Sequence, residues 1–152
     1  MRLWQELTEE SLEWSLEGLS RRLRIVPSGA FDLASNDYLG LAGDASVKNA
    51  AAQAALDFGA GARASRLVSG HLNLHEELEL QLAQFKKTEA ALLFPSGYQA
   101  NLATVTALSN AETLICCHKN NHASLIDACR LAAGAGATVR YFSSLPKLGK
   151  LL

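Results

Sequence analysis

The feature that most constrains the fold is an alternation of strand-like and helix-like segments over residues 90–142. Three short apolar runs predict buried strands, at 90–94, 113–117 and 138–142. Two stretches between them predict helices, at 97–108 and 122–133. Short connections favour right-handed crossovers, which place the strands in one parallel sheet with helices on its faces. The sequence therefore predicts an α/β fold.

The residues before this alternation predict further helices separated by turns. Leucines at spacings of three to five predict an amphipathic helix over 2–24, and alternation of apolar and polar residues predicts a short strand at 31–34. Helices are also expected at 45–57 and at 73–86, the second with Asn73 as its N-cap and Glu76 completing a capping box. The small-residue loop 59–70 leaves its backbone open to a ligand.

Composition excludes several classes of function. Lys and Arg number 14 against 15 Asp and Glu, a formal charge of −1, so the basic excess of a nucleic-acid-binding protein is missing. Acidic residues near the N-terminus argue against a signal peptide. The lack of an 18-residue apolar run argues against a membrane-spanning helix. The 3 cysteines, two of them adjacent, favour reduced thiols. We expect a cytoplasmic protein.

Two expected strand-to-helix junctions carry candidate binding groups. At the first, Ser96 and Gly97 open a helix whose free N–H groups and positive dipole end favour an anion such as phosphate. The simpler interpretation is that Ser96 only caps the helix and Gly97 eases the turn.

The second junction, residues 116–124, holds two histidines, His118 and His122, beside two cysteines. The spacing is poor for zinc, and we expect no metal site. Taken alone, His122 is a helix N-terminal residue bonded to backbone. Because both junctions lie at the carboxyl edge of the same expected sheet, together they suit a phosphorylated planar cofactor.

Five ordered strings then resemble the α-oxoamine synthases, pyridoxal-phosphate enzymes of the fold-type I class. The strings lie at 35–41, 65–71, 75–79, 94–101 and 121–127. The resemblance spans about residues 15–142. It implies an N-terminal helical arm and short strand over 1–40, followed at 41–152 by the first part of a parallel-rich, three-layer large domain.

The resemblance also implies roles for single residues. Ser96, Gly97 and Tyr98 would bind the phosphate end of pyridoxal phosphate, and His122 would stack on the pyridine ring as a catalytic residue that also touches the substrate carboxylate. Arg21 and Asn36 would line the substrate pocket; Arg21 is equally well explained as a solvated helix charge.

The family condenses an amino acid with an acyl-CoA thioester, with loss of CO2, and builds its site from two subunits. The string 66–71 favours the branch that acts in biotin synthesis on alanine and a pimeloyl-type thioester. Two positions depart from the family pattern, Arg63 and His118. Since no lysine matches the family's Schiff-base lysine, we expect a fragment that is inactive alone. The alternatives are a non-catalytic partner subunit and another branch of the family.

Overall fold

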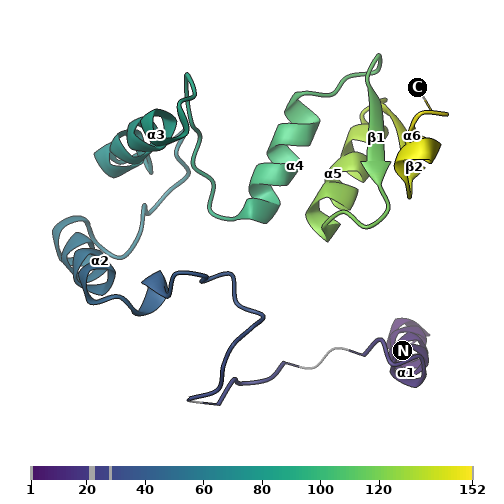
Figure 1. The fold of residues 1–152 in the computed structure, drawn as a ribbon, viewed down its shortest axis with the longest axis horizontal. Helices are drawn as coiled ribbons and strands as arrows, with labels where there is room; N and C mark the ends of the chain where they lie inside the picture. Colours follow the sequence, from purple (N-terminus) through teal and green to yellow (C-terminus); the bar gives the residue numbers. More distant parts are fainter. Residues whose placement is uncertain (1, 21–22, 28, 152) are drawn as a thin grey trace. The chain divides into compact units, whose positions relative to one another are not determined.

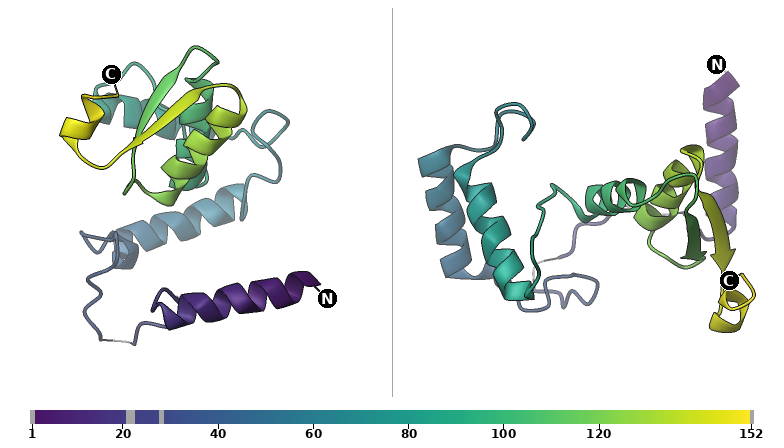
Figure 2. Two further views of the ribbon diagram at one scale, coloured as in Figure 1. Left: turned by 90° about the vertical axis from the view of Figure 1, so that its right-hand side faces the viewer. Right: turned by 90° about the horizontal axis from the view of Figure 1, so that it is seen from above.

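A computed structural model describes residues 2–20, 23–27 and 29–151 (Figures 1 and 2). The chain divides into two compact units, Met1–Ala60 and Gly61–Leu152, and each is described by itself. The division expected near residue 40 stays a prediction. No helix in the described part of the chain is both long and apolar enough to cross a membrane.

The described residues of the first unit form the α-helices α1 (Arg2–Leu16) and α2 (Ala45–Phe58) and a short 3-10 helix η1 (Leu41–Gly43). The helix expected over 2–24 is thus too long in the prediction. Gly18 has φ 70°, and the Leu19 N–H donates to the Trp14 carbonyl at 2.8 Å. A left-handed glycine with such a back-bond ends the helix.

The strand expected at 31–34 is wrong, because Leu33 and Ala34 form a bend and the two residues before them have no regular structure. The Asp32 carboxylate accepts hydrogen bonds from the backbone N–H groups of Ala34 at 3.0 Å and Ser35 at 3.1 Å. A short polar side chain that bonds its own backbone stabilises a turn in place of a ladder. The helix expected at 45–57 is confirmed as α2, which Asp44 caps through the N–H groups of Ser46 and Val47.

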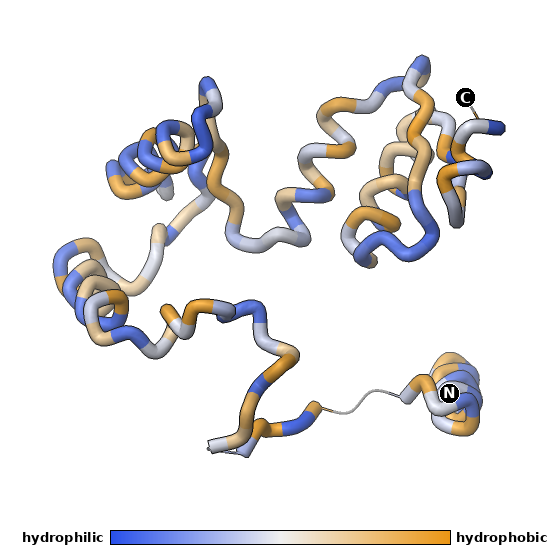
Figure 3. Tube along the Cα trace, viewed as in Figure 1, coloured by the Kyte–Doolittle hydropathy of each residue, from blue (hydrophilic) through white to orange (hydrophobic). Residues whose placement is uncertain are grey.

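The second unit contains the expected β–α–β arrangement. Its elements are α3 (Asn73–Lys86), α4 (Gly97–Ala107), β1 (Leu114–His118), α5 (Ala123–Gly134), β2 (Thr138–Phe142) and α6 (Leu145–Leu148). β1 and β2 pair in parallel, with Leu114 opposite Thr138 and His118 opposite Phe142. β1 is mostly hydrophobic (Figure 3). The predicted parallel sheet and its crossover helix are confirmed.

The core of this unit is built from small side chains. Cys117 of β1 is buried against α5, whose buried residues are Ser124, Ala128, Cys129 and Ala132. Burial raises the pKa of the Cys129 thiol to about 11, and a hydrogen bond with Cys117 adds to the shift. Small residues let the helix approach the sheet closely. This close packing sets the position of the N-terminus of α5 relative to the end of β1.

The buried strand expected at 90–94 is wrong. Only β1 and β2 form a ladder among the described residues. The Leu93 N–H donates to the Glu79 carboxylate at 2.7 Å, and the Leu93 carbonyl accepts from Arg66 at 3.2 Å. Leu92 is 75% exposed. A strand needs a neighbouring strand for its backbone groups, and here side chains take that place.

The expected capping box at α3 is also wrong in register. Asn73 is the first helical residue and Leu72 is the N-cap. The Leu72 N–H donates to Nδ1 of His75 at 3.0 Å. The His75 imidazole therefore accepts the hydrogen bond from the N-cap backbone that was expected to go to Glu76, one residue later.

Candidate active site

Two helix N-termini lie at the end of the unit toward which β1 points. α4 follows its N-cap Ser96, and α5 follows its N-cap His122. Both helices begin on the side where β1 ends at His118 (Figure 1). Such an edge is where α/β proteins gather their ligand-binding groups.

Two hydrogen bonds join the first turns of α4 and α5. The Tyr98 hydroxyl donates to Oδ2 of Asp127 at 2.5 Å, and Nδ2 of Asn101 donates to Oγ of Ser124 at 2.8 Å. Since Tyr98 and Asn101 are one turn apart, they share a helix face. The structure thus brings the Ser96–Tyr98 segment and His122 to one place.

The start of α4 offers donors to an anion. Oγ of Ser96 accepts from the Gln99 N–H at 3.2 Å, which confirms the N-cap. The N–H groups of Gly97 and Tyr98 occupy the first two helical positions, which have no partner within a helix. A Cβ added at Gly97 would meet nothing within 4 Å. Exposed backbone donors, open space and the positive end of the helix dipole fit a phosphate group.

His122 combines a fixed nitrogen with an exposed side chain. Its Nδ1 accepts from the Ser124 N–H at 3.2 Å and lies 2.7 Å from Oγ of Ser124. The interpretation of His122 as a helix N-terminal residue bonded to backbone is therefore confirmed. The residue is exposed, so a planar ring has room to reach the imidazole.

His118 is engaged in local contacts. Its Nδ1 accepts from the Asn120 N–H at 3.1 Å, and its ring packs edge-on against Phe142 with centroids 5.1 Å apart. Within residues 2–20, 23–27 and 29–151, no group of three or more His, Cys, Asp or Glu side chains is placed to hold a metal ion.

The charges near Tyr98 hold its hydroxyl in place. The hydrogen bond to Asp127 raises the pKa of Tyr98, and burial adds to the shift. The same bond lowers the pKa of Asp127, helped by Arg130 at 2.8 Å. At neutral pH Tyr98 is thus a neutral donor to an ionised carboxylate, and its backbone N–H stays available for a ligand.

The loop 61–72 is tied to α3 by a second network. Arg66 makes two contacts to the Glu79 carboxylate, at 2.6 and 2.9 Å, and a third to His71 at 3.1 Å. The Arg66 guanidinium and the Leu93 N–H lower the pKa of Glu79 to about 2. Arg63 has φ 62°, a conformation that favours glycine. This network connects the loop, α3 and the segment that leads to Ser96.

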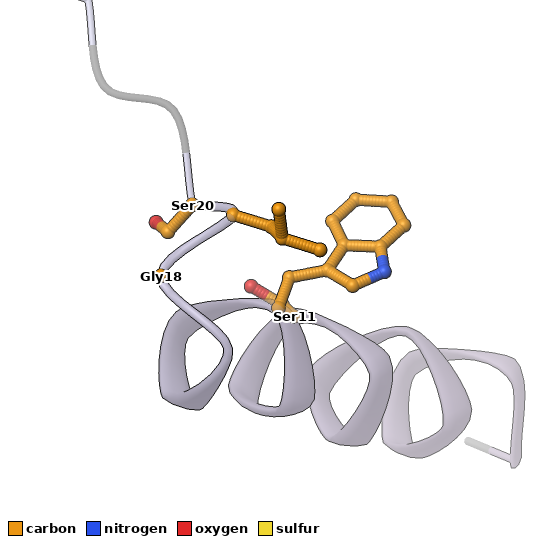
Figure 4. Close-up of a pocket in the computed structure, with 5 residues that line it drawn as sticks. Ser11, Gly18 and Ser20 are labelled. Carbon is orange, nitrogen blue, oxygen red and sulfur yellow. The ribbon is translucent and has the colours of Figure 1, made fainter.

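The remaining candidates belong to the first unit. Arg21 lies outside the described residues. Asn36 is exposed, and its Oδ1 accepts from the Tyr38 hydroxyl at 3.4 Å. The substrate-binding roles of Arg21 and Asn36 stay predictions. A pocket at the end of α1 is lined by Ser11, Trp14, Gly18, Leu19 and Ser20 (Figure 4).

Three residues that complete this site were given no role from the sequence: Asn101, Ser124 and Asp127. Asn101 lies three residues after Tyr98, and Asp127 lies three residues after Ser124, so each pair shares a helix face, which is a usable signal. Which residue of one helix bonds which residue of the other depends on how α4 and α5 pack, and a single sequence does not state that.

Comparison with known proteins defines the class. The model of the aminotransferase class I and II family matches residues 28–148. The chain belongs to this family of pyridoxal-phosphate enzymes, and the predicted resemblance is confirmed.

Two curated relatives of the chain share one name. The 8-amino-7-oxononanoate synthase of Mycobacterium sp. (strain KMS) is 51% identical over 117 residues, which are 76% of this chain and 31% of that protein. The enzyme of the same name from Dechloromonas aromatica (strain RCB) is 44% identical over 147 residues, 90% of this chain and 38% of that protein. The chain spans about a third of the length of these relatives.

Solved structures agree on the fold. Serine palmitoyltransferase from Sphingomonas wittichii is 34% identical, with a TM-score of 0.66 over 70% of this chain and 26% of that one. The S. paucimobilis serine palmitoyltransferase, solved with pyridoxal phosphate and myriocin, is 25% identical, with a TM-score of 0.79 over 99% of this chain and 42% of that one. The Francisella tularensis 8-amino-7-oxononanoate synthase is 26% identical, with a TM-score of 0.64 over 82% and 34%. The predicted fold class, the N-terminal part of a fold-type I enzyme, is confirmed.

Proposed function

We propose that this chain forms the first part of a pyridoxal-phosphate-dependent α-oxoamine synthase. The reaction is the condensation of L-alanine with a pimeloyl-type acyl-CoA, with loss of CO2, in biotin synthesis. The shared name of the relatives from Mycobacterium and Dechloromonas supports this choice of substrates.

The observation that carries the proposal is the pairing of the first turns of α4 and α5. The bonds Tyr98–Asp127 and Asn101–Ser124 place exposed backbone donors and an exposed imidazole at one end of the unit. Those are the two kinds of group that a phosphorylated aromatic cofactor needs. The residues present therefore fit pyridoxal phosphate.

Each residue has a separate task in this proposal. The N–H groups of Gly97 and Tyr98 bind the phosphate, while Ser96 holds the helix start in place. His122 stacks on the pyridine ring and contacts the substrate carboxylate. Pyridoxal phosphate, when bound, supplies an electron sink for the substrate's α-carbon.

By the family resemblance, we also assign Arg21 and Asn36 to substrate binding. We place the protein in the cytoplasm, because its 3 cysteines cannot all pair and the adjacent Cys116 and Cys117 would form a strained bridge. The exposed apolar side chains of both units support self-association as a homodimer.

A second set of substrates has one specific observation in its favour. The Sphingomonas wittichii serine palmitoyltransferase is 34% identical to this chain. Serine with a long-chain acyl-CoA is therefore the alternative to test first. The glycine C-acetyltransferase and 5-aminolevulinate synthase reactions, which use glycine, come after it.

A graft separates these reactions. Residues 28–148 of this chain replace the matching segment of the Mycobacterium relative, and the Dechloromonas segment serves as the control graft. We expect the first chimera to condense alanine with pimeloyl-CoA in preference to serine with palmitoyl-CoA or glycine with acetyl-CoA. A preference for serine or glycine, or an inactive chimera beside an active control, would overturn the choice of substrates.

A further inference from the structure

A fully buried hydroxyl lies between the two helices at the candidate site. Ser124 is 0% exposed and stands in the first turn of α5. Its Oγ lies 2.8 Å from Nδ2 of Asn101 and 2.7 Å from Nδ1 of His122. Three polar side chains from two helices thus form one continuous hydrogen-bonded chain that ends at an exposed imidazole.

One backbone group determines which of these side chains donate hydrogen bonds and which accept them. The Ser124 N–H points to Nδ1 of His122 at 3.2 Å, and an amide N–H can only donate. Nδ1 must therefore be the unprotonated nitrogen. The Ser124 hydroxyl then donates its proton to Nδ1, and its oxygen is left to accept from the Asn101 amide.

The opposite direction is inconsistent with the same contacts. If the Asn101 carbonyl oxygen accepted from Ser124, the hydroxyl oxygen would have to accept from a protonated Nδ1. That proton would then compete with the Ser124 N–H for the same space. The order Asn101 to Ser124 to His122 avoids this conflict, with the Ser124 N–H and hydroxyl sharing the lone pair of Nδ1.

We infer that Asn101 and Ser124 are positioning residues, which hold His122 in the tautomer with its proton on Nε2. They fix the ring orientation from the Nδ1 side and leave Nε2–H free to donate while the imidazole is neutral. Neither residue needs to touch a ligand for this role. The benefit to cofactor binding rests on the proposed function, whereas the tautomer itself does not.

The tautomer is measured directly by NMR of the imidazole nitrogens in the full chain at alkaline pH without cofactor. We expect the Nδ1 signal of His122 in the unprotonated range and the Nε2 signal in the protonated range. A protonated Nδ1 in the wild-type chain would overturn the inference without reference to any variant.

Asn101→Asp replaces the amide that donates to the Ser124 hydroxyl with a carboxylate. A carboxylate only accepts, so it draws the Ser124 hydroxyl proton away from His122. We expect the Nδ1 signal of His122 to shift within the unprotonated range, because Nδ1 loses the hydroxyl donor and keeps the Ser124 N–H, while backbone spectra show that the unit remains folded. The control is Asn49→Asp, the same change at an exposed position of α2. An unchanged His122 in Asn101→Asp, or an equal change in Asn49→Asp, would contradict the inference.

Ser124→Ala tests the consequence for binding without adding charge. Loss of one oriented hydrogen bond should weaken the affinity for pyridoxal phosphate by about 2- to 10-fold. Ser109→Ala is the matched control, because Oγ of Ser109 donates to the Val105 carbonyl at the far end of α4. If wild type binds and Ser124→Ala binds equally well, the positioning role is wrong and the proposed function stands. If wild type does not bind, the proposed function fails and the tautomer result is judged alone.

Discussion

Glu79 is a residue whose pKa is strongly lowered by its partners. Its side chain is 15% exposed and accepts from Arg66 and from the Leu93 N–H. These contacts lower its pKa from 4.5 to about 2. A carboxylate with a depressed pKa stabilises the folded state above its ordinary pKa, and that contribution is lost as the pH falls toward the depressed value.

We therefore predict that Glu79→Gln destabilises the second unit at neutral pH. The difference from wild type should shrink as the pH falls from 4.5 to about 2, the interval set by the two pKa values. Urea unfolding followed at α3 over this range gives the measurement. A difference in stability that is the same at neutral pH and below that interval would show that the ion pair is not the cause.

Prediction from sequence succeeded at single residues where the cause is local. Ser96 and His122 both cap helices, as their positions before a helix indicate. The prediction of Asn73 as an N-cap was wrong because the Leu72 N–H donates to His75 instead. The structural role of Arg66 depends on its contacts with Glu79 and Leu93, which are far from it in sequence. Contacts between residues far apart in the sequence could not be predicted from the sequence.

At the scale of elements, Gly70 sets the path of the loop before α3. It is buried, and a Cβ built there would overlap the carbonyl group of Ala64. We predict that Gly70→Ala destabilises the second unit by about 1–3 kcal/mol, because the backbone must shift. Gly61→Ala is the control, since a Cβ at Gly61 meets nothing within 4 Å. Thermal unfolding compares the two, and equal midpoints would show that the close approach has no cost.

The start of α4 offers a second prediction. Ser96→Ala removes the cap and should cost about 1 kcal/mol of stability. Ser96→Asp keeps a capping oxygen and adds a negative charge where the phosphate is proposed to bind. We expect Ser96→Asp to be as stable as wild type and to lose pyridoxal phosphate binding by more than Ser96→Ala does. Stronger binding of pyridoxal phosphate by Ser96→Asp would show that the phosphate does not bind at the start of α4.

Elements were predictable from sequence where periodicity was long and ends were marked. α2, α4, α5, β1 and β2 lie close to their expected positions. α1 ended early, at Leu16, because Gly18 turns the backbone into the left-handed region, and the segment 90–94 formed no strand because no described segment pairs with it. A strand is defined by its partner, so an apolar run alone did not establish one.

At the scale of the whole molecule, we predict that the chain alone carries out no condensation. Covalent catalysis with pyridoxal phosphate needs a lysine amine placed at the site, and no lysine here matches the family position. Adding pyridoxal phosphate and then borohydride should label exposed lysines only in part and at several positions. Stoichiometric labelling of a single lysine, with turnover of alanine and an acyl-CoA, would contradict the prediction.

The first turns of α4 and α5 are proposed to hold a phosphorylated pyridine together. The most direct measurement is a backbone and imidazole NMR titration of the full chain with pyridoxine phosphate, which has no aldehyde to react with lysines. Pyridoxine without the phosphate serves as the control. We predict saturable shifts at the Gly97 and Tyr98 amides and at the His122 ring, with the amide shifts absent for pyridoxine. Saturable shifts confined to other residues, or none at these three, would contradict the claim.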